Sequence, residues 1–319
     1  MTTALVPIAQ TAIALNEDPA SRLFSAWIAS QTANTRQAYA KDIASFAAYL
    51  GAPSAAAAMR RLVSTDPGDG NGLLLDYRTY MSGEGLSTAT INRRLSAIRS
   101  AVKLARTLGH TNWKPEIAGL KAQSFRDTRG PGLEGTRELI SIALTDGNRA
   151  VAARDAAFIR LMFDLALRRG ECVGLDIEDI DLAGRRIWIL GKGRTQKEAR
   201  TLPDKTAAAL TAWIEARRVH VSDEQRAVFV SLSGRGGGQR ITGRSVHRII
   251  ASIGDLAGIK TRPHGLRHAS ITAALDINNG DVRAAQQHAR HANPQTTMKY
   301  DDNRRDIAGS VAHGISALV

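Results

Sequence analysis

Six polar residues in the C-terminal half of this 319-residue chain have types and spacings that suit chemistry at a phosphate ester. A pair of arginines can bind one phosphate through charge-assisted contacts and can stabilise the charge that develops in a pentavalent transition state. A tyrosine can act as the nucleophile when cations or a proton acceptor activate it, because a free phenol ionises only near pH ~10. The six candidate catalytic residues are Arg168, Lys192, His264, Arg267, His291 and Tyr300.

Arg168 follows an apolar stripe that runs to Ala166 with helical spacing, so we expect it where a buried helix ends. A cation at a helix C-terminus often does no more than compensate the helix dipole. Glu171 follows three residues later and is positioned to hold the guanidinium of Arg168 in a fixed orientation. The segment therefore indicates either dipole compensation or an arginine oriented to bind an anion.

The H-x-x-R spacing of His264 and Arg267 places both side chains on neighbouring positions of one helix, if a helix begins at this point. The spacing alone is a weak signal, since it occurs by chance in many chains. The His264–His268 and His288–His291 spacings also suggest zinc, but no H-E-x-x-H motif and no nearby carboxylate or thiol ligands accompany them. We therefore predict no metal site.

A short helix is predicted to carry Tyr300 near its end. Asn293 is a good N-cap residue and Pro294 suits the first helical position, so a helix is expected to begin there. Most tyrosines are half-buried packing residues, so Tyr300 taken alone does not indicate a nucleophile.

A β-hairpin with a long polar tip is predicted to carry Lys192. Arg186–Leu190 and Ala199–Leu202 are typical of strands, and they flank the tip Gly191–Lys197. Further along, Gly234–Gly238 is expected to form a flexible loop before a basic helix. The C-terminal half is therefore predicted to be mainly α-helical with a small antiparallel sheet.

The N-terminal part is predicted to be a bundle of four or five helices. Apolar residues recur at helical spacing in 35–50 and 87–107, and shorter helices are expected at about 20–31 and 71–83. The glycine-rich segment Asp66–Gly72 is expected to be the loop before the last of these helices.

The predicted helix at 87–107 carries five cations and no acid, and it therefore lacks the usual stabilising pairs of opposite charge. Contact with a phosphate backbone is the favoured interpretation, and an ordinary solvated face is the alternative. Together with basic residues elsewhere in the chain, the candidate DNA-binding residues are Arg36, Arg93, Arg94, Arg99, Lys103, Arg106, Arg244 and Arg248.

The overall charge favours a polyanionic partner. Forty-three Lys and Arg residues against 30 Asp and Glu residues give a net charge of +13 and a pI near 10.4. Residues 1–130 contain 15 basic and 9 acidic residues, an excess of 6, and the rest of the chain contains 28 and 21, an excess of 7. Both parts are basic, as expected if both contact the same polyanion.

Three further features indicate a cytoplasmic protein without a membrane partner. The sequence has no apolar run of 18 residues or more, and its N-terminus lacks the basic region of a secretory signal. Its single cysteine, Cys172, cannot form an internal disulfide and fits a reducing compartment.

These motifs together resemble those of the tyrosine recombinases, also called the phage-integrase family. Arg168 with Glu171 resembles the family's first arginine box, usually G-L-R-x-x-E, and Lys192 in Gly-Lys-Gly resembles the hairpin lysine. The H-x-L-R box is matched by His264-Gly-Leu-Arg267. The histidine of the usual L-G-H and the nucleophilic tyrosine are matched by His291 and Tyr300.

The sequence departs from the family pattern at three places. Ala166 replaces a common glycine, Ala289-Arg290 replaces Leu-Gly before the histidine, and Gly265 stands where an acid is frequent. None of these changes removes a catalytic group. The resemblance covers roughly residues 22–305.

The composition of the N-terminus and of residues 123–135, together with the resemblance, predicts a division of the chain into functional parts. Residues 1–20 would be a flexible tail, 21–122 a helical core-binding domain that contacts DNA, 123–135 an exposed linker, and 136–319 the catalytic domain. Residues 306–319 are expected to form a helix that docks on a neighbouring protomer or on its own domain.

The resemblance also implies a chemical mechanism. Tyr300 would attack the scissile phosphate, form a 3′-phosphotyrosyl bond and release a 5′-hydroxyl. Arg168 and Arg267 would bind the non-bridging oxygens, and Lys192 would protonate the leaving 5′-oxygen. The bond energy is kept in the covalent intermediate, so no cofactor is expected.

Three residues are implied in supporting roles. His264 would accept the tyrosine proton or donate a hydrogen bond to the phosphate, and His291 would add a further hydrogen bond. Glu171 would support Arg168.

The implied partner is double-stranded DNA with inverted-repeat binding sites, bound by a homodimer on one duplex and by a tetramer in the synaptic complex. Two alternatives remain: a non-catalytic DNA-binding regulator, and an enzyme similar to type IB topoisomerases that nicks and reseals DNA without strand exchange.

Overall fold

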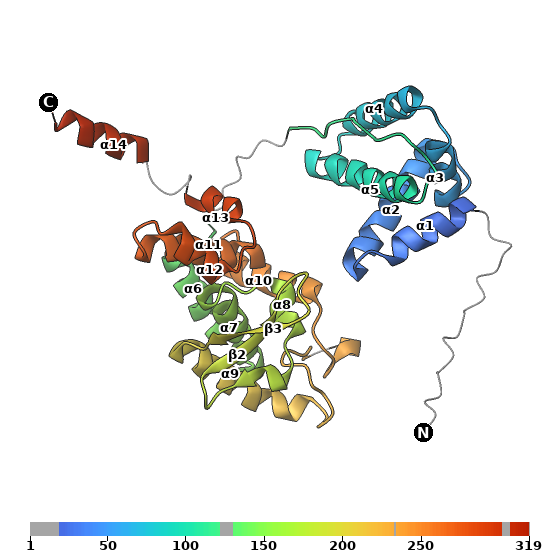
Figure 1. The fold of residues 1–319 in the computed structure, drawn as a ribbon. Helices are drawn as coiled ribbons and strands as arrows, with labels where there is room; N and C mark the ends of the chain where they lie inside the picture. Colours follow the sequence, from blue (N-terminus) through green and yellow to red (C-terminus); the bar gives the residue numbers. More distant parts are fainter. Residues whose placement is uncertain (1–18, 122–129, 233, 302–306, 319) are drawn as a thin grey trace, which may run out of the picture. The chain divides into compact units, whose positions relative to one another are not determined.

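The computed structural model describes residues 19–121, 130–232, 234–301 and 307–318, and the chain divides between Phe125 and Arg126 into two compact units (Figure 1). Most of the expected tail at 1–20 and most of the expected linker at 123–135 lie outside the described residues.

In its described part, the N-terminal unit consists of five helices: α1 (Pro19–Ala29), α2 (Ala33–Tyr49), α3 (Ala55–Val63), α4 (Pro67–Gly83) and α5 (Thr88–Thr107) (Figure 1). The helices expected from apolar periodicity at 35–50 and 87–107 are confirmed as α2 and α5. Ser87 caps α5, since its side chain accepts a hydrogen bond from the Thr90 backbone N–H. Trp27 and Phe46 are among the buried residues at the centre of the bundle.

The expectation of a loop at Asp66–Gly72 is wrong, because α4 already begins at Pro67. Proline suits the first helical position, and the Gly70 N–H donates to the Asp66 carbonyl oxygen at 2.8 Å. Gly70 is buried against Trp113, and a Cβ atom at this position would lie 2.7 Å from the indole ring. Gly70 thus allows α4 to pack closely on Trp113, and the glycine-rich composition of this segment wrongly indicated a loop.

The described part of the C-terminal unit is mainly helical. Its α-helices are α6 (Gly132–Leu144), α7 (Arg149–Asp164), α8 (Arg169–Gly174), α9 (Asp204–Arg217), α10 (Gly243–Leu256), α11 (Pro263–Ile277), α12 (Val282–Ala289), α13 (Pro294–Asp301) and α14 (Ile307–Ser316). Short 3-10 turns occur at Ile177–Asp179, Arg218–His220 and Gly234–Gly236. Because α6 begins at Gly132, the last four residues of the expected linker are helical, and the proposed boundary at 135 lies inside a helix.

Helix α7 runs through the core of this unit. Most of its residues from Ala150 to Met162 are buried, and Phe158 stacks on Phe229 with ring centroids 3.9 Å apart. The Asn148 side chain caps the helix by accepting from two backbone N–H groups. A rigid central helix of this kind gives the following segment, which contains Arg168, a fixed starting point.

A three-stranded antiparallel sheet packs on this core in the order β1 (Ile180–Asp181), β2 (Arg186–Leu190), β3 (Lys197–Thr201). The predicted hairpin is confirmed, but β3 begins at Lys197 rather than at Ala199, because Lys197 pairs with Leu190. The tip is therefore 191–196. Strand β1 was not predicted, since two residues are too short for a periodicity signal.

The predicted fold class, mainly α with a small antiparallel sheet, is confirmed (Figure 1). The helix expected in 306–319 is present as α14. None of the helices in the described ranges combines the length and the apolar character that a membrane span requires.

Candidate active site

A cavity of about 360 Å³ opens in the C-terminal unit beside α8 and α11. Every charged or titratable residue that lines it is basic, so the cavity suits an anion. The lining residues are Arg168, Arg169, Gly170, His247, Arg262, Pro263, His264 and Arg267. Three of the six predicted catalytic residues thus meet in one cavity, although 96 or more residues separate Arg168 from the other two.

Arg168 lies at the N-cap of α8 and not, as expected, at the end of the buried helix, because α7 ends at Asp164. Dipole compensation at a helix C-terminus is therefore ruled out as its role. Glu171 holds Arg168 at two points: its carboxylate accepts from the backbone N–H at 2.8 Å and from Nη1 at 2.8 Å. Burial works to raise the pKa of Glu171, but Arg290 and Arg168 outweigh it and hold that pKa below its usual value.

Arg267 projects from the first turns of α11 and is only 2% exposed. Its Nη1 donates to the Ala166 carbonyl oxygen and its Nη2 to the Ala289 carbonyl oxygen. Burial, assisted by the charge of Arg168, lowers its pKa to about 10, so the guanidinium stays charged at neutral pH. A guanidinium has five N–H donors. Two of them bind these carbonyl oxygens, and the guanidinium makes no other hydrogen bond within the described residues, so its other donors are candidates to bind a ligand in the cavity.

The histidine of the H-x-x-R pair, His264, lies one helical turn before His268, and their rings meet edge to face with centroids 4.1 Å apart. Desolvation and the charges of Arg267 and Arg168 lower the pKa of His264, so its imidazole is neutral at pH 7. His268 in turn contacts Tyr300, with ring centroids 4.8 Å apart. His268 was considered in the sequence only as a zinc ligand, although its i, i+4 spacing from His264 already placed it on the same helix face.

Tyr300 lies near the end of α13, a helix that begins at Pro294 as predicted. The Asn293 side chain accepts from the Gln295 N–H at 2.9 Å and so caps this helix. Tyr300 is 8% exposed and packs in a small apolar cluster with Ile271 and Leu275 of α11. Burial raises its pKa above the usual value, and Arg267 and Arg168 offset this only in part. The phenol is therefore protonated at neutral pH, and as a nucleophile it needs a proton acceptor.

The ring of His291 lies on Tyr300 with centroids 6.1 Å apart. Its Nδ1 is 2.9 Å from the hydroxyl of Thr297, a fully buried residue that sequence reasoning missed. Burial, with Arg267 and other nearby cations, lowers the pKa of His291 to about 4. A neutral ring with one nitrogen held by Thr297 keeps the other nitrogen for a ligand.

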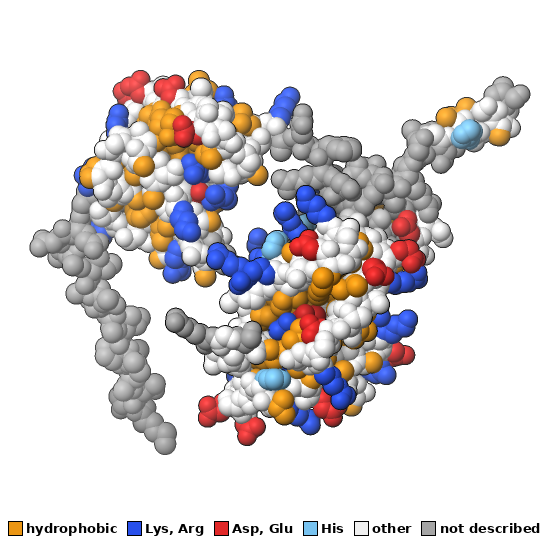
Figure 2. Space-filling view, turned by 180° about the vertical axis from the view of Figure 1, so that it is seen from behind, with side chains coloured by type: hydrophobic (Ala, Val, Ile, Leu, Met, Phe, Trp, Pro, Cys, Tyr) orange, Lys and Arg blue, Asp and Glu red, His pale blue; other side chains and the backbone are white. Residues whose placement is uncertain are grey.

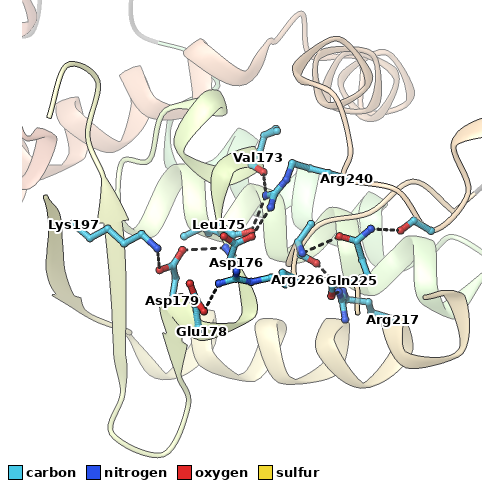
Figure 3. Close-up of polar contacts among 12 residues, drawn as sticks. Val173, Leu175, Asp176, Glu178, Asp179, Lys197, Arg217, Gln225, Arg226 and Arg240 are labelled. Atoms are coloured by element: carbon cyan, nitrogen blue, oxygen red, sulfur yellow. Dashed lines mark hydrogen bonds and ion pairs between the residues drawn. The ribbon is translucent and has the colours of Figure 1, made fainter. Parts of the chain in front are cut away.

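The sixth predicted catalytic residue, Lys192, makes no described contact with the other five. It is exposed in the β2–β3 turn and does not line the cavity. The other lysine of the hairpin, Lys197, begins β3 next to the tip and forms an ion pair with Asp179, and Arg240 binds the nearby Asp176 (Figure 3). Lys197 is thus engaged in an ion pair, and Lys192 is the hairpin lysine that remains available to a ligand.

Several cations of the basic helix α5 have partners within the protein, whereas the sequence favoured free cations that contact a phosphate backbone. Arg93 and Arg94 face Asp42 of α2, which supplies the acid that α5 itself lacks. Arg99 donates to the Ile117 carbonyl oxygen, and Arg36 of α2 lies 3.3 Å from the Ala29 carbonyl oxygen. Four of the eight candidate DNA-binding residues are exposed, and their side chains make no hydrogen bond or ion pair within the described ranges: Lys103, Arg106, Arg244 and Arg248.

Lys and Arg side chains are present on the surfaces of both units (Figure 2). In the part of the chain that the structure describes, no three His, Cys, Asp or Glu side chains gather in a way that would hold a metal ion.

Comparison with known sequences places the site in a family context. Residues 136–306 match the model of the phage integrase family. A tyrosine recombinase of Synechococcus elongatus is 35% identical over 292 residues, which cover 90% of both chains. A tyrosine recombinase XerC of Salmonella typhi is 32% identical over 230 residues, covering 68% of this chain and 70% of the relative.

Solved structures show the same fold at low sequence identity. The Tn1549 transposon integrase in complex with transposon right end DNA superposes with a TM-score of 0.67 at 16% identity, covering 94% of this chain and 99% of that one. A lambda integrase dimer bound to a core site gives a TM-score of 0.60 at 14% identity, covering 90% and 95% of the two chains.

Proposed function

The chain belongs to the phage integrase family of tyrosine recombinases, and from this premise we propose that it is a site-specific DNA recombinase acting through a 3′-phosphotyrosyl intermediate. One observation carries the proposal: Arg168, His264 and Arg267 line a cavity whose charged residues are all basic, and Tyr300 lies close enough to both arginines that their charges favour its ionised form. Such a cavity suits one phosphate, and the tyrosine beside it is the candidate nucleophile.

Arg168, which is partly exposed, and the buried Arg267 are proposed to bind the non-bridging oxygens of the scissile phosphate. Arg168 is fixed by Glu171, and Arg267 is fixed by the two carbonyl oxygens that it contacts. Donors held in this way need no reorganisation when charge develops on the phosphorus oxygens, so they favour the transition state over the ground state.

The covalent step is proposed as an in-line exchange of one phosphodiester for another. The Tyr300 hydroxyl oxygen bonds to phosphorus as the bond to the 5′-oxygen breaks, and Lys192 gives a proton to that leaving oxygen. The proton of Tyr300 passes to a neutral imidazole, for which His264 is the candidate, or to water, and His291 donates a hydrogen bond to the phosphate. Attack by the 5′-hydroxyl of another strand reverses the step, without a cofactor.

The proposed partner is double-stranded DNA with inverted-repeat sites. XerH bound to a palindromic difH substrate gives a TM-score of 0.60 at 19% identity, covering 78% of this chain and 72% of that one. The lambda relative is a dimer on a core site. We infer a dimer on one duplex and a tetramer on two, with the N-terminal unit as a core-binding domain. Its exposed Lys103 and Arg106 would contact backbone phosphates.

Covalent trapping tests this function. Wild-type protein and Tyr300→Phe would be incubated with DNA from around the gene, denatured, and the DNA ends that remain attached to protein sequenced. We expect a 3′ adduct at an inverted repeat with wild type and none with Tyr300→Phe, while gel-shift assays show the same DNA affinity for both. An adduct that persists in Tyr300→Phe would refute the nucleophile.

The two alternatives give different results in the same experiment. A non-catalytic regulator binds the DNA and forms no adduct with wild type. An enzyme that only nicks and reseals forms the adduct but does not join strands from two duplexes, and it acts as a monomer.

A further inference from the structure

Arg290, directly before His291, has a conformation that its residue type does not favour. It ends α12 with φ 55° and ψ 44°, in the left-handed region, while its N–H donates to the carbonyl oxygens of the last helical turn. Glycine is the usual residue at such a helix end, because a Cβ atom makes this conformation strained. The presence of arginine here indicates that its side chain makes contacts that compensate the strain.

The side chain of Arg290 points into the protein and is 4% exposed. Its Nη2 lies 2.6 Å from Oε2 of Glu171, and its Nη1 donates to the Leu165 carbonyl oxygen at 3.1 Å. Nη2 also lies 3.5 Å from the Ala166 carbonyl oxygen. Its Nε is buried and has no hydrogen-bond partner within the described residues. Burying a guanidinium with one donor unsatisfied is costly, so stability alone is a poor reason for this arrangement.

These contacts converge on the segment that presents Arg168 to the cavity. Ala166 is itself in the left-handed region, with φ 48°, and its carbonyl oxygen accepts from Arg267 as well as facing Arg290. The Glu171 carboxylate bridges the two other guanidinium groups, with Oε1 on Arg168 and Oε2 on Arg290. Arg290 therefore contacts both the backbone before Arg168 and the carboxylate that orients it.

We propose that Arg290 is a positioning residue for DNA cleavage, which fixes the guanidinium of Arg168 by clamping Glu171 and the 165–166 backbone. The proposal rests on the function proposed above. Arg290 does not reach the phosphate itself, since its own donors are directed at Glu171 and at backbone oxygens, and it does not line the cavity. Its removal would leave Arg168 present but free to turn away from the phosphate.

Arg290→Gly is the informative substitution, because glycine accepts the left-handed backbone and only the side-chain contacts are lost. The rate of covalent adduct formation would be measured in a single turnover at saturating DNA. Affinity would be measured separately by gel shift in a Tyr300→Phe background. We expect the rate to fall by about 10²-fold, as for a misplaced catalytic group, with the dissociation constant changed by less than about 3-fold. This split distinguishes positioning from a loss of folded protein, which would lower binding and rate together.

Arg185→Gly is a matched control. Arg185 also has a left-handed backbone, with φ 53°, and pairs with a carboxylate, Asp204, at 2.5 Å, but this pair is exposed in the turn before β2. We expect the control to cleave at the wild-type rate. If Arg290→Gly fails to fold, Arg290→Lys serves instead: lysine keeps the charge but cannot bridge Glu171 and the carbonyl oxygens, and a loss of about 10-fold is expected.

The outcomes separate the two proposals. A wild-type protein that forms no adduct would refute the recombinase function and this inference with it. A wild type that cleaves, together with an Arg290→Gly or Arg290→Lys variant that cleaves within 2-fold of its rate, would refute the inference alone. As a second check, the variant that combines Glu171→Gln with Arg290→Gly should lose much less cleavage rate than the product of the two single losses, since both residues act on Arg168. Additive losses would contradict the proposed clamp.

Discussion

Two regions of the molecule, the candidate site of the C-terminal unit and the end of α5 in the N-terminal unit, hold their positive charge in different environments. In the C-terminal unit, Arg267 and Arg290 are buried and their donors are directed at fixed carbonyl and carboxylate oxygens. In the N-terminal unit, Lys103 and Arg106 of α5 are exposed, and their side chains make no hydrogen bond or ion pair within the described ranges. The excess of basic over acidic residues is similar in the two parts, 6 and 7, but the environments of these two sets of cations differ.

This difference has a physical consequence. A buried guanidinium has lost its hydration, so its electrostatic effect on a phosphate is strong and fixed in direction. An exposed cation is screened by water and salt, and it contributes affinity that falls as salt rises. We therefore expect substitutions in the C-terminal site to change rates, and substitutions on α5 to change salt-dependent binding.

Lys192 is the strongest test of this comparison, because it is exposed and yet assigned a chemical role. Lys192→Ala is expected to slow cleavage by about 10²–10⁴-fold, the range of general acid catalysis. The loss should disappear on DNA in which sulfur replaces the 5′-bridging oxygen, since a thiolate leaves without a proton. An equal loss on both substrates would show that Lys192 acts in binding and not as an acid.

Arg267→Ala should lower the single-turnover cleavage rate by about 10²–10³-fold, as when one preorganised donor to a developing oxyanion is removed. Arg267→Lys keeps the charge but cannot span the Ala166 and Ala289 carbonyl oxygens, and it is expected to recover only part of the rate. If both variants cleave normally while binding DNA weakly, the buried arginine contributes only affinity, and the comparison between the units fails.

The buried His288 predicts that the stability of the C-terminal unit depends on pH. It is hydrogen bonded to Ser270 at 2.8 Å, and burial, together with nearby arginines, lowers its pKa to about 4 from a usual 6.5. The unfolded chain therefore binds more protons between these values, and stability falls as pH drops through that window. Relative to His288→Gln, wild type should lose at most about 3 kcal/mol of unfolding free energy from pH 7 to pH 4. The unfolding free energies of both proteins would be measured in urea at each pH. If the two values change in parallel with pH, this prediction is wrong.

Lys103→Ala should give the smallest effect. DNA binding should weaken modestly, and the slope of log K against log salt should decrease by about 1, with cleavage at saturation unchanged.

Arg93→Ala offers a contrast on the same helix, because it leaves the buried Asp42 carboxylate with only Arg94 at 4.0 Å. We expect that variant to lose thermal stability. A change of salt slope in Arg93→Ala without a loss of stability would show that the ion pair opens to bind DNA.

Several parts of the fold follow from local patterns. Helices α2, α5 and α13 and the β2–β3 hairpin were predicted because periodicity, capping residues and polar turns are properties of neighbouring residues. The loop expected at Asp66–Gly72 was wrong because Gly70 is required by Trp113, a contact over 43 positions that no local pattern contains. The acid that pairs with Arg93 was missed for the same reason, since Asp42 is on another helix.

By itself, the sequence determined the mainly helical fold, the identity of the candidate catalytic residues and the family to which the chain belongs, because residue type and spacing carry that information. Only the tertiary structure decided how those residues are held. It placed Arg168 at the start of α8, gave Glu171 two arginine partners, and put His268 between His264 and Tyr300. The physical reason is that burial and electrostatic coupling depend on distance in space, and segments more than 100 residues apart meet at this site.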